Sequence, residues 1–469
     1  MATYERSSRY SSGTDAAAST RRPWIIAIAG AVVMLIIGTI YSWAVFTQPL
    51  LVAFDWDLTT TTWAYAIANF CLAALGAVAG GFWQDRAGPR KVALTGIALW
   101  GAGNVLAGLG TAKFGAPWLY VTYGVVGGLG AGMAYVAPLA MVSKWFPERR
   151  GLAGGLVVGG FGLGAFVYNE CIPRIESFHA AAVHAANFIA ARAAALAANA
   201  PFDPRTLGAA QTLTAGDTAA VMRIFVLSGL AFLIVGLPAA ALFRNPPSPA
   251  CRAAPLRQPA GIPPSKVLGM PQFYLLWAQL FANVVAGIVI ISNAVCILGD
   301  LTKLPAGAIA PLFGLVSIFN AVGRFFWGGV SDRIGCNATF AAMFSVQAVA
   351  LFWLAGVHDL VSALAGISLV LLCCGGGFGT MPSYSAQHFG TKYLGLNYGL
   401  VLSAWGFAGL IGPVLVAHLK DQRGSFAGMM PVIAAMLAVC VILPFVTRRA
   451  EPKVHEAARE TGVIPALQA

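Results

Sequence analysis

One arginine lies inside a long apolar segment, where a charge is energetically costly. Arg324 falls in the run 314–328, which is otherwise free of charge, and Asn320 precedes it by four residues. Burying a guanidinium group in hydrocarbon costs several kcal/mol, so such a residue normally faces a cavity or a partner. Its planar set of N–H donors can hold a carboxylate in two parallel hydrogen bonds, which lysine cannot do. The four-residue spacing puts Asn320 on the same helical face, where it can orient Arg324 or an anion.

A second interpretation of Arg324 stays open at this point. Asp332 follows Arg324 by eight residues in the sequence, which is roughly 12 Å along a helix. A long basic side chain can extend toward the membrane surface, with its charge in water and its stem in lipid. Arg324 is therefore either an internal anion ligand or a residue that reaches the inner surface.

Aromatic residues of four other apolar segments are candidates to surround Arg324. They are Tyr41, Tyr135, Phe378 and Trp405. A dry aromatic wall strengthens an arginine–carboxylate attraction and limits the size of the anion, and a tyrosine hydroxyl can donate a hydrogen bond to it. For each residue the alternative is ordinary packing or a place in the aromatic belt at the membrane surface.

The composition is that of an integral membrane protein. Of 469 residues, 58% are hydrophobic and 10% are charged, whereas soluble domains carry roughly 25% charged residues. The net charge of +12 does not indicate nucleic-acid binding, because the basic residues are scattered over short hydrophilic gaps. The eight cysteines have no zinc-ligand spacing, and no complete nucleotide-binding motif is present. We therefore expect no metal and no cofactor.

Twelve apolar segments of about 20 residues each predict twelve transmembrane helices in two sets of six. The expected organisation is an N-terminal tail at 1–22, a first half at 23–243 with an outer loop at 171–219, a linker at 244–270, a second half at 271–447 and a C-terminal tail at 448–469. The predicted helices are 23–48, 61–84, 92–112, 116–143, 151–170, 220–243, 271–297, 307–330, 338–357, 360–383, 396–418 and 425–447.

The distribution of basic residues predicts the orientation. With both termini inside, twenty Lys and Arg residues fall on the inner side and eight on the outer side, with Arg324 in addition. Basic residues concentrate on the cytoplasmic side of membrane proteins. We expect a multi-pass protein of the cell (inner) membrane, with both termini in the cytoplasm and the lipid bilayer as its surroundings.

The two halves repeat a charged motif. The sequence GFWQDRAG begins at residue 81 and GGVSDRIG at residue 328, so Asp85 and Asp332 occupy equivalent positions. Two parallel six-helix halves are typical of transporters that rock about a site near the middle of the membrane. Charges at these helix ends are predicted to lock the inner gate, because they can pair in the outward-facing state and separate in the inward-facing state. Anchoring by basic residues alone does not explain the repeated Asp. The predicted gate residues are Asp85, Arg86, Arg90, Asp332 and Arg333.

The motif GFWQDRAGPRK at 81–91 resembles the loop 2–3 signature of the major facilitator superfamily, and 328–335 resembles its partial copy. Within the superfamily, several other segments resemble the oxalate/formate antiporter family, which is related to the monocarboxylate transporters. These segments are GTIYSWAVF at 38–46, GRFFWG at 323–328, GGGFGTMP at 375–382, FGTK at 389–392, SAW at 403–405 and GP at 412–413. The resemblance covers nearly the whole chain and implies the major facilitator fold and transport of small carboxylates.

The resemblance also implies roles for single residues. Both families use an arginine of the eighth helix to bind the substrate carboxylate, which supports Arg324 as the main ligand. Tyr41, Tyr135 and Trp405 gain support as substrate-binding residues from the same match, and Phe378 gains less.

Two departures from the family pattern bear on substrate and coupling. The oxalate exchanger has a lysine on its eleventh helix, whereas the matching residues 402–406 contain none before Lys420. One buried cation matches a monocarboxylate such as formate, lactate or pyruvate better than oxalate, which remains the less favoured substrate. No Asp or Glu lies deep in a predicted helix, and Asn320 stands where some monocarboxylate transporters carry Asp. This favours anion exchange, with proton-linked symport as the alternative.

Other classes of protein fit less well. A membrane enzyme needs buried nucleophiles, paired carboxylates or metal ligands, and none is evident. A non-transporting membrane sensor normally carries a soluble signalling domain, but the tails here have about 22 residues each. The prediction is an all-α secondary transporter that acts as a monomer by alternating access. The alanine-rich stretch 177–200 in the outer loop is predicted to form a helix, either on the membrane surface or over the cavity.

Overall fold

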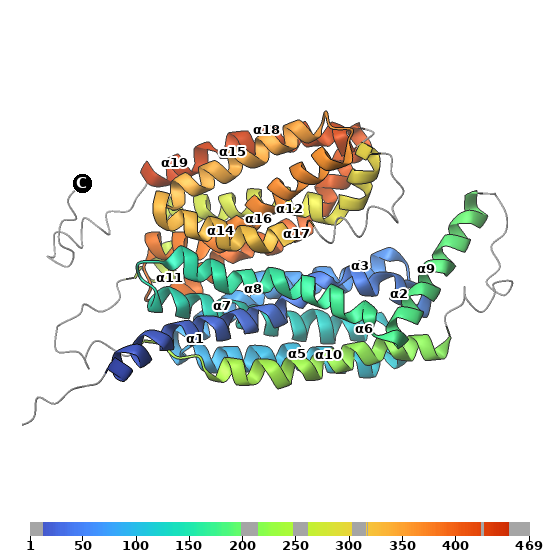
Figure 1. Ribbon diagram of the computed structural model, residues 1–469, viewed down its shortest axis with the longest axis horizontal. Coiled ribbons are helices and arrows are strands. Elements are labelled where there is room, and N and C mark those ends of the chain that lie inside the picture. Colours follow the sequence, from blue (N-terminus) through green and yellow to red (C-terminus); the bar gives the residue numbers. More distant parts are fainter. Residues whose placement is uncertain are drawn as a thin grey trace, which may run out of the picture.

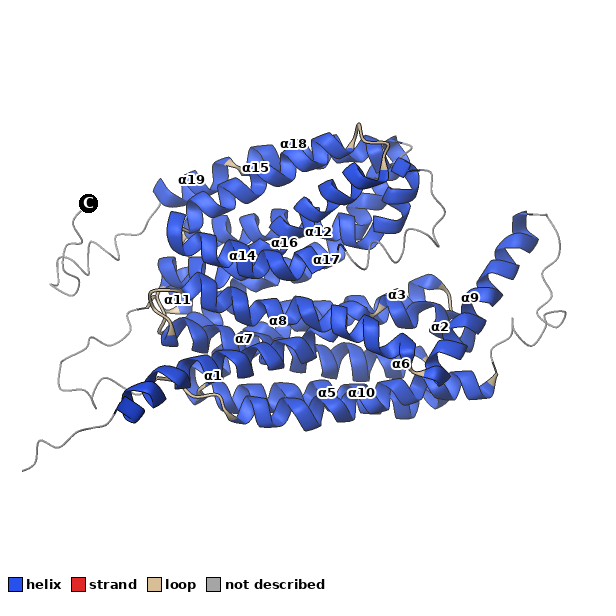
Figure 2. Ribbon diagram, viewed as in Figure 1, coloured by secondary structure: helices blue, strands red, loops and turns tan. Residues whose placement is uncertain are grey.

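The computed structural model describes residues 13–197, 214–246, 261–302, 316, 318–423 and 426–449. Every regular element in these ranges is helical (Figure 2). This is expected, because a helix satisfies its own backbone hydrogen bonds where the bilayer offers no water. Ten of these helices are long and apolar enough to cross a membrane. α12 (Pro271–Thr302) and α14 (Ile318–Ile334) occupy the remaining two predicted positions, so the twelve-helix prediction is confirmed.

Several of the membrane-crossing helices of the first half contain short 3₁₀ or π segments. The first runs through α1 (Gly13–Gly38), η1 (Thr39–Ser42) and α2 (Ala44–Phe54). The second runs through α3 (Leu58–Phe70), η2 (Cys71–Gly76) and α4 (Ala77–Ala87). The others are α5 (Pro89–Phe114), α6 (Ala116–Leu119) with η3 (Tyr120–Gly127) and α7 (Gly128–Trp145), α8 (Arg150–Cys171) and α10 (Ala215–Ala241). Between α8 and α10 lie η4 (Ile172–Arg174) and α9 (Glu176–Ala197).

The second half begins, after the short α11 (Pro264–Val267), with α12 and α14. The remaining helices are α15 (Cys336–Leu354), α16 (Leu360–Phe389), α17 (Leu394–Arg423), α18 (Phe426–Cys440) and α19 (Ile442–Arg449). Residues 1–12 and 450–469 of the predicted tails and most of the predicted linker lie outside the described residues, so the domain boundaries stay predictions. The helix α1 begins at Gly13, within the predicted N-terminal tail.

The two halves lie against each other along their length (Figure 1). Two pairs dominate the interface: α17 packs on α3, η2 and α4, and α14 packs on α8. α16 also contacts α8, and α7 reaches α16 and α17. The second helix of each half therefore meets the fifth helix of the other half, a two-fold related arrangement that is expected for halves that rock relative to each other.

Glycines allow α14 to lie very close to its neighbours. A Cβ atom added to Gly155 of α8 or to Gly379 of α16 would collide with the carbonyl oxygen of Arg324. Small residues let membrane helices approach closely without a loss of packing. Arg324 is therefore held at a fixed depth between one helix of each half.

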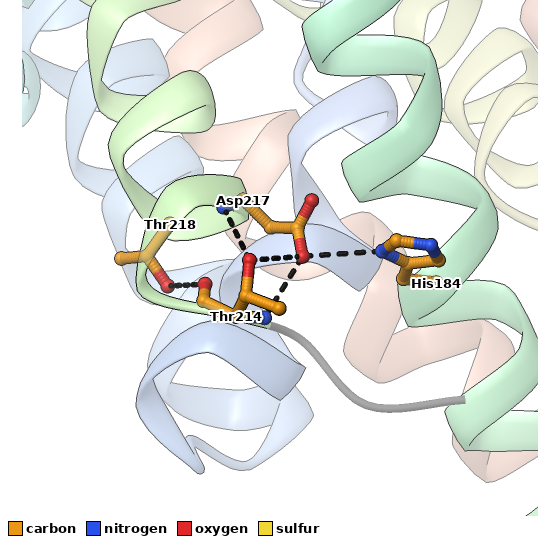
Figure 3. Close-up of polar contacts among 4 residues, drawn as sticks. All are labelled: His184, Thr214, Asp217 and Thr218. Atoms are coloured by element: carbon orange, nitrogen blue, oxygen red, sulfur yellow. Dashed lines mark hydrogen bonds and ion pairs between the residues drawn. The ribbon is translucent and has the colours of Figure 1, made fainter. Parts of the chain in front are cut away.

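The outer helix α9 is attached to the first half by its N-terminal part. Phe178 is fully buried and its ring lies 5.7 Å from that of Phe46 in α2. His184 Nδ1 lies 3.1 Å from a carboxylate oxygen of Asp217, which also accepts from the backbone N–H of Thr214 at the start of α10 (Figure 3). The prediction of a helix in this loop is confirmed for its described residues. The rest of α9 extends beyond the bundle (Figure 1).

Candidate functional site

Arg324 lies in the interior of the protein, between the two halves. Its side chain is 1% exposed, so it does not extend to the surface. Its Nε and Nη2 donate to Oδ1 of Asn320 at 3.3 and 3.1 Å, and its Nη1 donates to the carbonyl oxygen of Val158 in α8 at 3.3 Å. The predicted pairing of Arg324 with Asn320 is thus present, and the amide oxygen holds one edge of the guanidinium group.

The guanidinium group keeps unused hydrogen-bond donors. Arginine has five N–H donors, and three are engaged by Asn320 and Val158. Within the described residues, no Asp or Glu forms an ion pair with Arg324. One N–H on Nη1 and one on Nη2 have no partner there, and two such donors can hold the two oxygens of a carboxylate.

Five aromatic rings form one cluster of contacts that includes Arg324, and we call them the aromatic cage: Tyr41, Tyr135, Phe161, Phe378 and Trp405. The guanidinium carbon lies 5.1 Å from the ring centre of Phe161 and 4.9 Å from that of Phe378, within the range of cation–π attraction. Trp405 contacts all four other rings, with centre separations between 5.2 and 5.8 Å. The structure therefore brings together the four aromatic residues predicted from the sequence.

The cage is built from both halves. Tyr41 lies in the 3₁₀ segment η1, Tyr135 in α7 and Phe161 in α8, whereas Phe378 lies in α16 and Trp405 in α17. Tyr41 is partly exposed, and the other four rings are buried. Because the rings come from both halves, a rocking motion must change the cage.

Sequence reasoning missed Phe161. It stands in the run Gly159–Gly164, where glycine alternates with larger residues, and its ring contacts Tyr41 and Tyr135 at 5.1 and 5.4 Å. A single aromatic residue among glycines on a helix that packs closely was a usable signal, because the ring is then the only large group on that face.

A second missed residue is Tyr398 of α17, which is 1% exposed. It precedes Trp405 by seven residues and so lies on the same face of the helix. Its hydroxyl, like that of Tyr135, is buried without a hydrogen-bond partner among the described residues, and it lies within electrostatic range of Arg324. The helical spacing from Trp405 was the signal that could have found it.

The predicted gate aspartates join the two halves at the end of the bundle that carries the basic loops. Asp85 accepts hydrogen bonds from the backbone N–H groups of Gly395 and Leu396 at 3.1 and 2.9 Å. Asp332 accepts from those of Gly151 and Leu152 at 2.8 and 2.7 Å. We call these contacts the Asp85 clasp and the Asp332 clasp.

The two clasps have the same construction. Each aspartate ends the second helix of one half and binds the second and third residues of the fifth helix of the other half, α17 or α8. A helix N-terminus has free N–H groups and a partial positive charge, so a carboxylate is stabilised there. The prediction that these aspartates connect the halves fits the geometry, although their partners are backbone amides and not basic side chains.

The predicted basic gate residues take other positions. Arg86 lies 3.8 Å above the ring of Phe82. Arg90 and Arg333 are exposed, and neither forms an ion pair with any described residue. The attractive charges near the clasps come instead from Lys144, beside Asp85, and Arg150, beside Asp332. Lys144 lies in the last turn of α7 and Arg150 begins α8, and neither was among the predicted gate residues.

Comparison with known proteins identifies the family. The sequence matches the Major Facilitator Superfamily over residues 25–169, 212–413 and 289–468. The chain belongs to this superfamily. Its relatives and the solved structures of its fold are transporters and not enzymes, so this member of the superfamily is a multi-pass membrane transporter.

Curated relatives extend the similarity over most of the chain. The oxalate:formate antiporter of Oxalobacter formigenes is 25% identical over 434 residues, which cover 92% of this chain and 93% of that protein. Apicoplast pyruvate carrier 1 of Toxoplasma gondii is 25% identical over 82% of this chain and 75% of that protein. Monocarboxylate transporter 13 of Rattus norvegicus is 30% identical over 29% of this chain and 30% of that protein. The predicted resemblance to the oxalate/formate antiporter family is confirmed.

Solved structures support the fold alone. FucP, a Major Facilitator Superfamily transporter in the outward conformation, has a TM-score of 0.65 at 14% identity and covers 90% of this chain and 98% of its own. The proton:xylose symporter XylE has a TM-score of 0.64 at 12% identity and covers 92% of this chain and 96% of its own.

Proposed function

We propose that this protein is a secondary transporter that exchanges small monocarboxylates across the cell membrane. The observation that carries the proposal is Arg324, a buried cation with two free N–H donors inside an aromatic cage between the halves. A carboxylate would neutralise the guanidinium group and accept both donors. The surrounding rings would exclude water, which strengthens this attraction.

The charge of the cage favours a monocarboxylate. Arg324 is the only Lys or Arg among the described residues that carries a contact with a cage ring. α17 contributes Trp405 and Tyr398 to this region, where the family's oxalate exchanger carries a lysine. One guanidinium balances one negative charge, so formate, lactate and pyruvate fit better than dianionic oxalate. The names of the relatives, which include a pyruvate carrier and monocarboxylate transporters, support the same substrate class.

The lack of an acidic partner for Arg324 among the described residues favours anion exchange. Within the described residues, no Asp or Glu forms an ion pair with Arg324, so none of their carboxylates neutralises its charge. A closed state with an unpaired guanidinium is costly, whereas a closed state with a bound anion is neutral. The halves would therefore change position most easily when an anion is bound, and this condition produces exchange. Proton-linked symport would need a titratable group elsewhere.

The clasps would form the gate of this cycle. By the bias of basic residues, the end that carries both clasps faces the cytoplasm. Intact clasps hold the halves together there, so the transporter could open only to the outside. Movement to the inward-facing state requires that both carboxylates leave the helix N-termini of α17 and α8.

Counterflow in proteoliposomes tests the proposal. Vesicles with purified protein, loaded with one of formate, acetate, lactate, pyruvate or oxalate, are given a trace of the same labelled anion at two pH values. Exchange predicts uptake of monocarboxylates that needs internal substrate and changes little with pH. Uptake without internal substrate that rises at low pH would instead indicate symport. Absence of flux for every anion would contradict transport of carboxylates and favour a sensor.

A further inference from the structure

Two buried tyrosine hydroxyls lie beside the arginine, one from each half. Tyr135 of α7 and Tyr398 of α17 are 0% and 1% exposed. The ring of Tyr135 packs on Phe161 at 5.4 Å, and the guanidinium group of Arg324 packs on the same ring at 5.1 Å. Both hydroxyls are within electrostatic range of Arg324. They are therefore neighbours of the position where a carboxylate would bind.

The hydroxyl pair is not fully satisfied. Neither hydroxyl has a hydrogen-bond partner among the described residues, and this includes the hydroxyl of the other tyrosine. Each tyrosine has one O–H donor. If one hydroxyl donates to the other, the second O–H is still unused. A buried polar group without a partner is destabilising, so a ligand that supplies an acceptor here would be stabilised.

We infer that Tyr135 and Tyr398 bind the oxygen on carbon 2 of the substrate, so that the transporter selects short 2-oxo and 2-hydroxy monocarboxylates. The inference rests on the proposed function, because it assumes that Arg324 binds the carboxylate. In pyruvate and lactate the carbon with the second oxygen is bonded directly to the carboxyl carbon. A molecule with its carboxylate on Arg324 can therefore turn its 2-oxygen toward the neighbouring hydroxyl pair.

The pair would also discriminate against simple fatty acids. Propionate has the same carbon skeleton as lactate but lacks the 2-oxygen, so its binding leaves the spare O–H without a partner. Sites that hydrogen-bond a polar substrate group reject analogues without that group much more strongly than apolar sites distinguish a methylene. Because Tyr135 and Tyr398 belong to opposite halves, the 2-oxygen would also help to hold the halves in the closed state around the substrate.

The test compares lactate, pyruvate and propionate in counterflow, with kcat and KM measured for the wild type, Tyr398→Phe, Tyr135→Phe and the double variant. Phenylalanine keeps the ring and its packing and removes only the hydroxyl. Tyr168→Phe is the matched control, because the Tyr168 hydroxyl bonds to Ser228 Oγ at 2.7 Å within the first half, away from the cage.

The expected result is a selective loss for the oxygenated substrates. Tyr398→Phe should raise the KM of lactate and pyruvate about tenfold, the effect of one lost hydrogen bond of about 1.4 kcal/mol. Its KM for propionate should change little, and Tyr168→Phe should behave as the wild type for all three. The double variant should lose the preference for lactate over propionate.

Three results would overturn the inference. An equal change for all three substrates in Tyr398→Phe would show a structural role only. An unchanged ratio of lactate to propionate in every variant, with transport intact, would reject the hydroxyl pair and leave the proposed function standing. Absence of carboxylate transport by the wild type would instead reject the proposed function and this inference together.

Discussion

The centre of the molecule and its clasp end both place charges between the halves, but in opposite ways. At the centre a cation, Arg324, lies among aromatic rings with two donors free. At the clasp end two anions, Asp85 and Asp332, already accept two backbone N–H bonds each from the opposite half. Arg324 therefore still has donors for a ligand, whereas the two aspartates already accept hydrogen bonds from the opposite half.

This difference separates two functions within one interface. A group that keeps free donors can gain energy from a ligand, so the centre is suited to recognise the substrate. A group that is satisfied across the halves stabilises one arrangement of them, so the clasps are suited to set the conformational equilibrium. Substitutions at the centre should change binding, and substitutions at the clasps should change the populations of the states.

The largest expected effect is that of Arg324→Ala. Loss of one member of a buried charge pair costs about 2–5 kcal/mol, so counterflow of all monocarboxylates should be nearly abolished. Arg324→Lys is the companion variant, which keeps the charge but loses the planar donor pair and should retain part of the activity. If Arg324→Ala exchanged monocarboxylates near the wild-type rate, at equal protein content of the vesicles, Arg324 would not be the residue that binds the substrate.

The second-largest expected effect concerns the close packing of α16 against α14, which fixes the position of Arg324 between the halves. Gly379→Ala places a Cβ against the carbonyl oxygen of Arg324, and overpacking of this kind costs about 1–3 kcal/mol. We expect lower thermal stability and slower exchange, because α14 and α16 must separate. Gly409→Ala is the matched control, since its Cβ would have no heavy atom within 4 Å. Equal melting temperatures and rates for both variants would show that the close approach is not needed.

The sequence predicted the centre better than the clasps. Arg324 was evident because a charge in an apolar run is conspicuous, and the helical spacing linked it to Asn320. Tyr135 and Trp405 came from the resemblance, because no local pattern tells a cage ring from a packing ring. Phe161 and Tyr398 were missed since their importance depends on which faces of α8 and α17 meet α14 and α7. That is a property of tertiary packing.

The clasps show a different limit of prediction from the sequence. The repeated motif identified Asp85 and Asp332, but ion pairs were expected because side-chain charges can be read from a sequence. The actual partners are backbone N–H groups at the starts of α8 and α17, and backbone donors leave no mark in residue types. The start of a helix such as α8 or α17 can be predicted from the local sequence. Which helix end of the other half lies opposite that start cannot be predicted in this way.

Asp85→Asn should have the larger effect of the two clasp substitutions. The variant keeps the side-chain shape but loses the charge and one of two acceptor oxygens. Asp85 is half-buried and close to Lys144, and charge–helix interactions in such surroundings reach about 2 kcal/mol. Spin labels on the two halves at the clasp end should report more of the open state. Asp359→Asn is the control, because Asp359 caps its own helix, α16, within one half; the same opening in both variants would argue against a clasp.

Asp332→Asn should also increase the population of the open state, but by the smallest amount of these substitutions. Asp332 is exposed, and water weakens a charge–helix interaction to about 0.3–1 kcal/mol at such positions. The same distance measurement should therefore show a smaller shift than for Asp85→Asn, and raised salt should reduce the difference between Asp332→Asn and the wild type, because exposed charges are screened. If the two substitutions are made together and the clasps act on one closed state, their shifts in free energy should add. A larger effect of Asp332→Asn than of Asp85→Asn would mean that burial does not determine which clasp stabilises the closed state more. The α8–α14 contact would then control the gate.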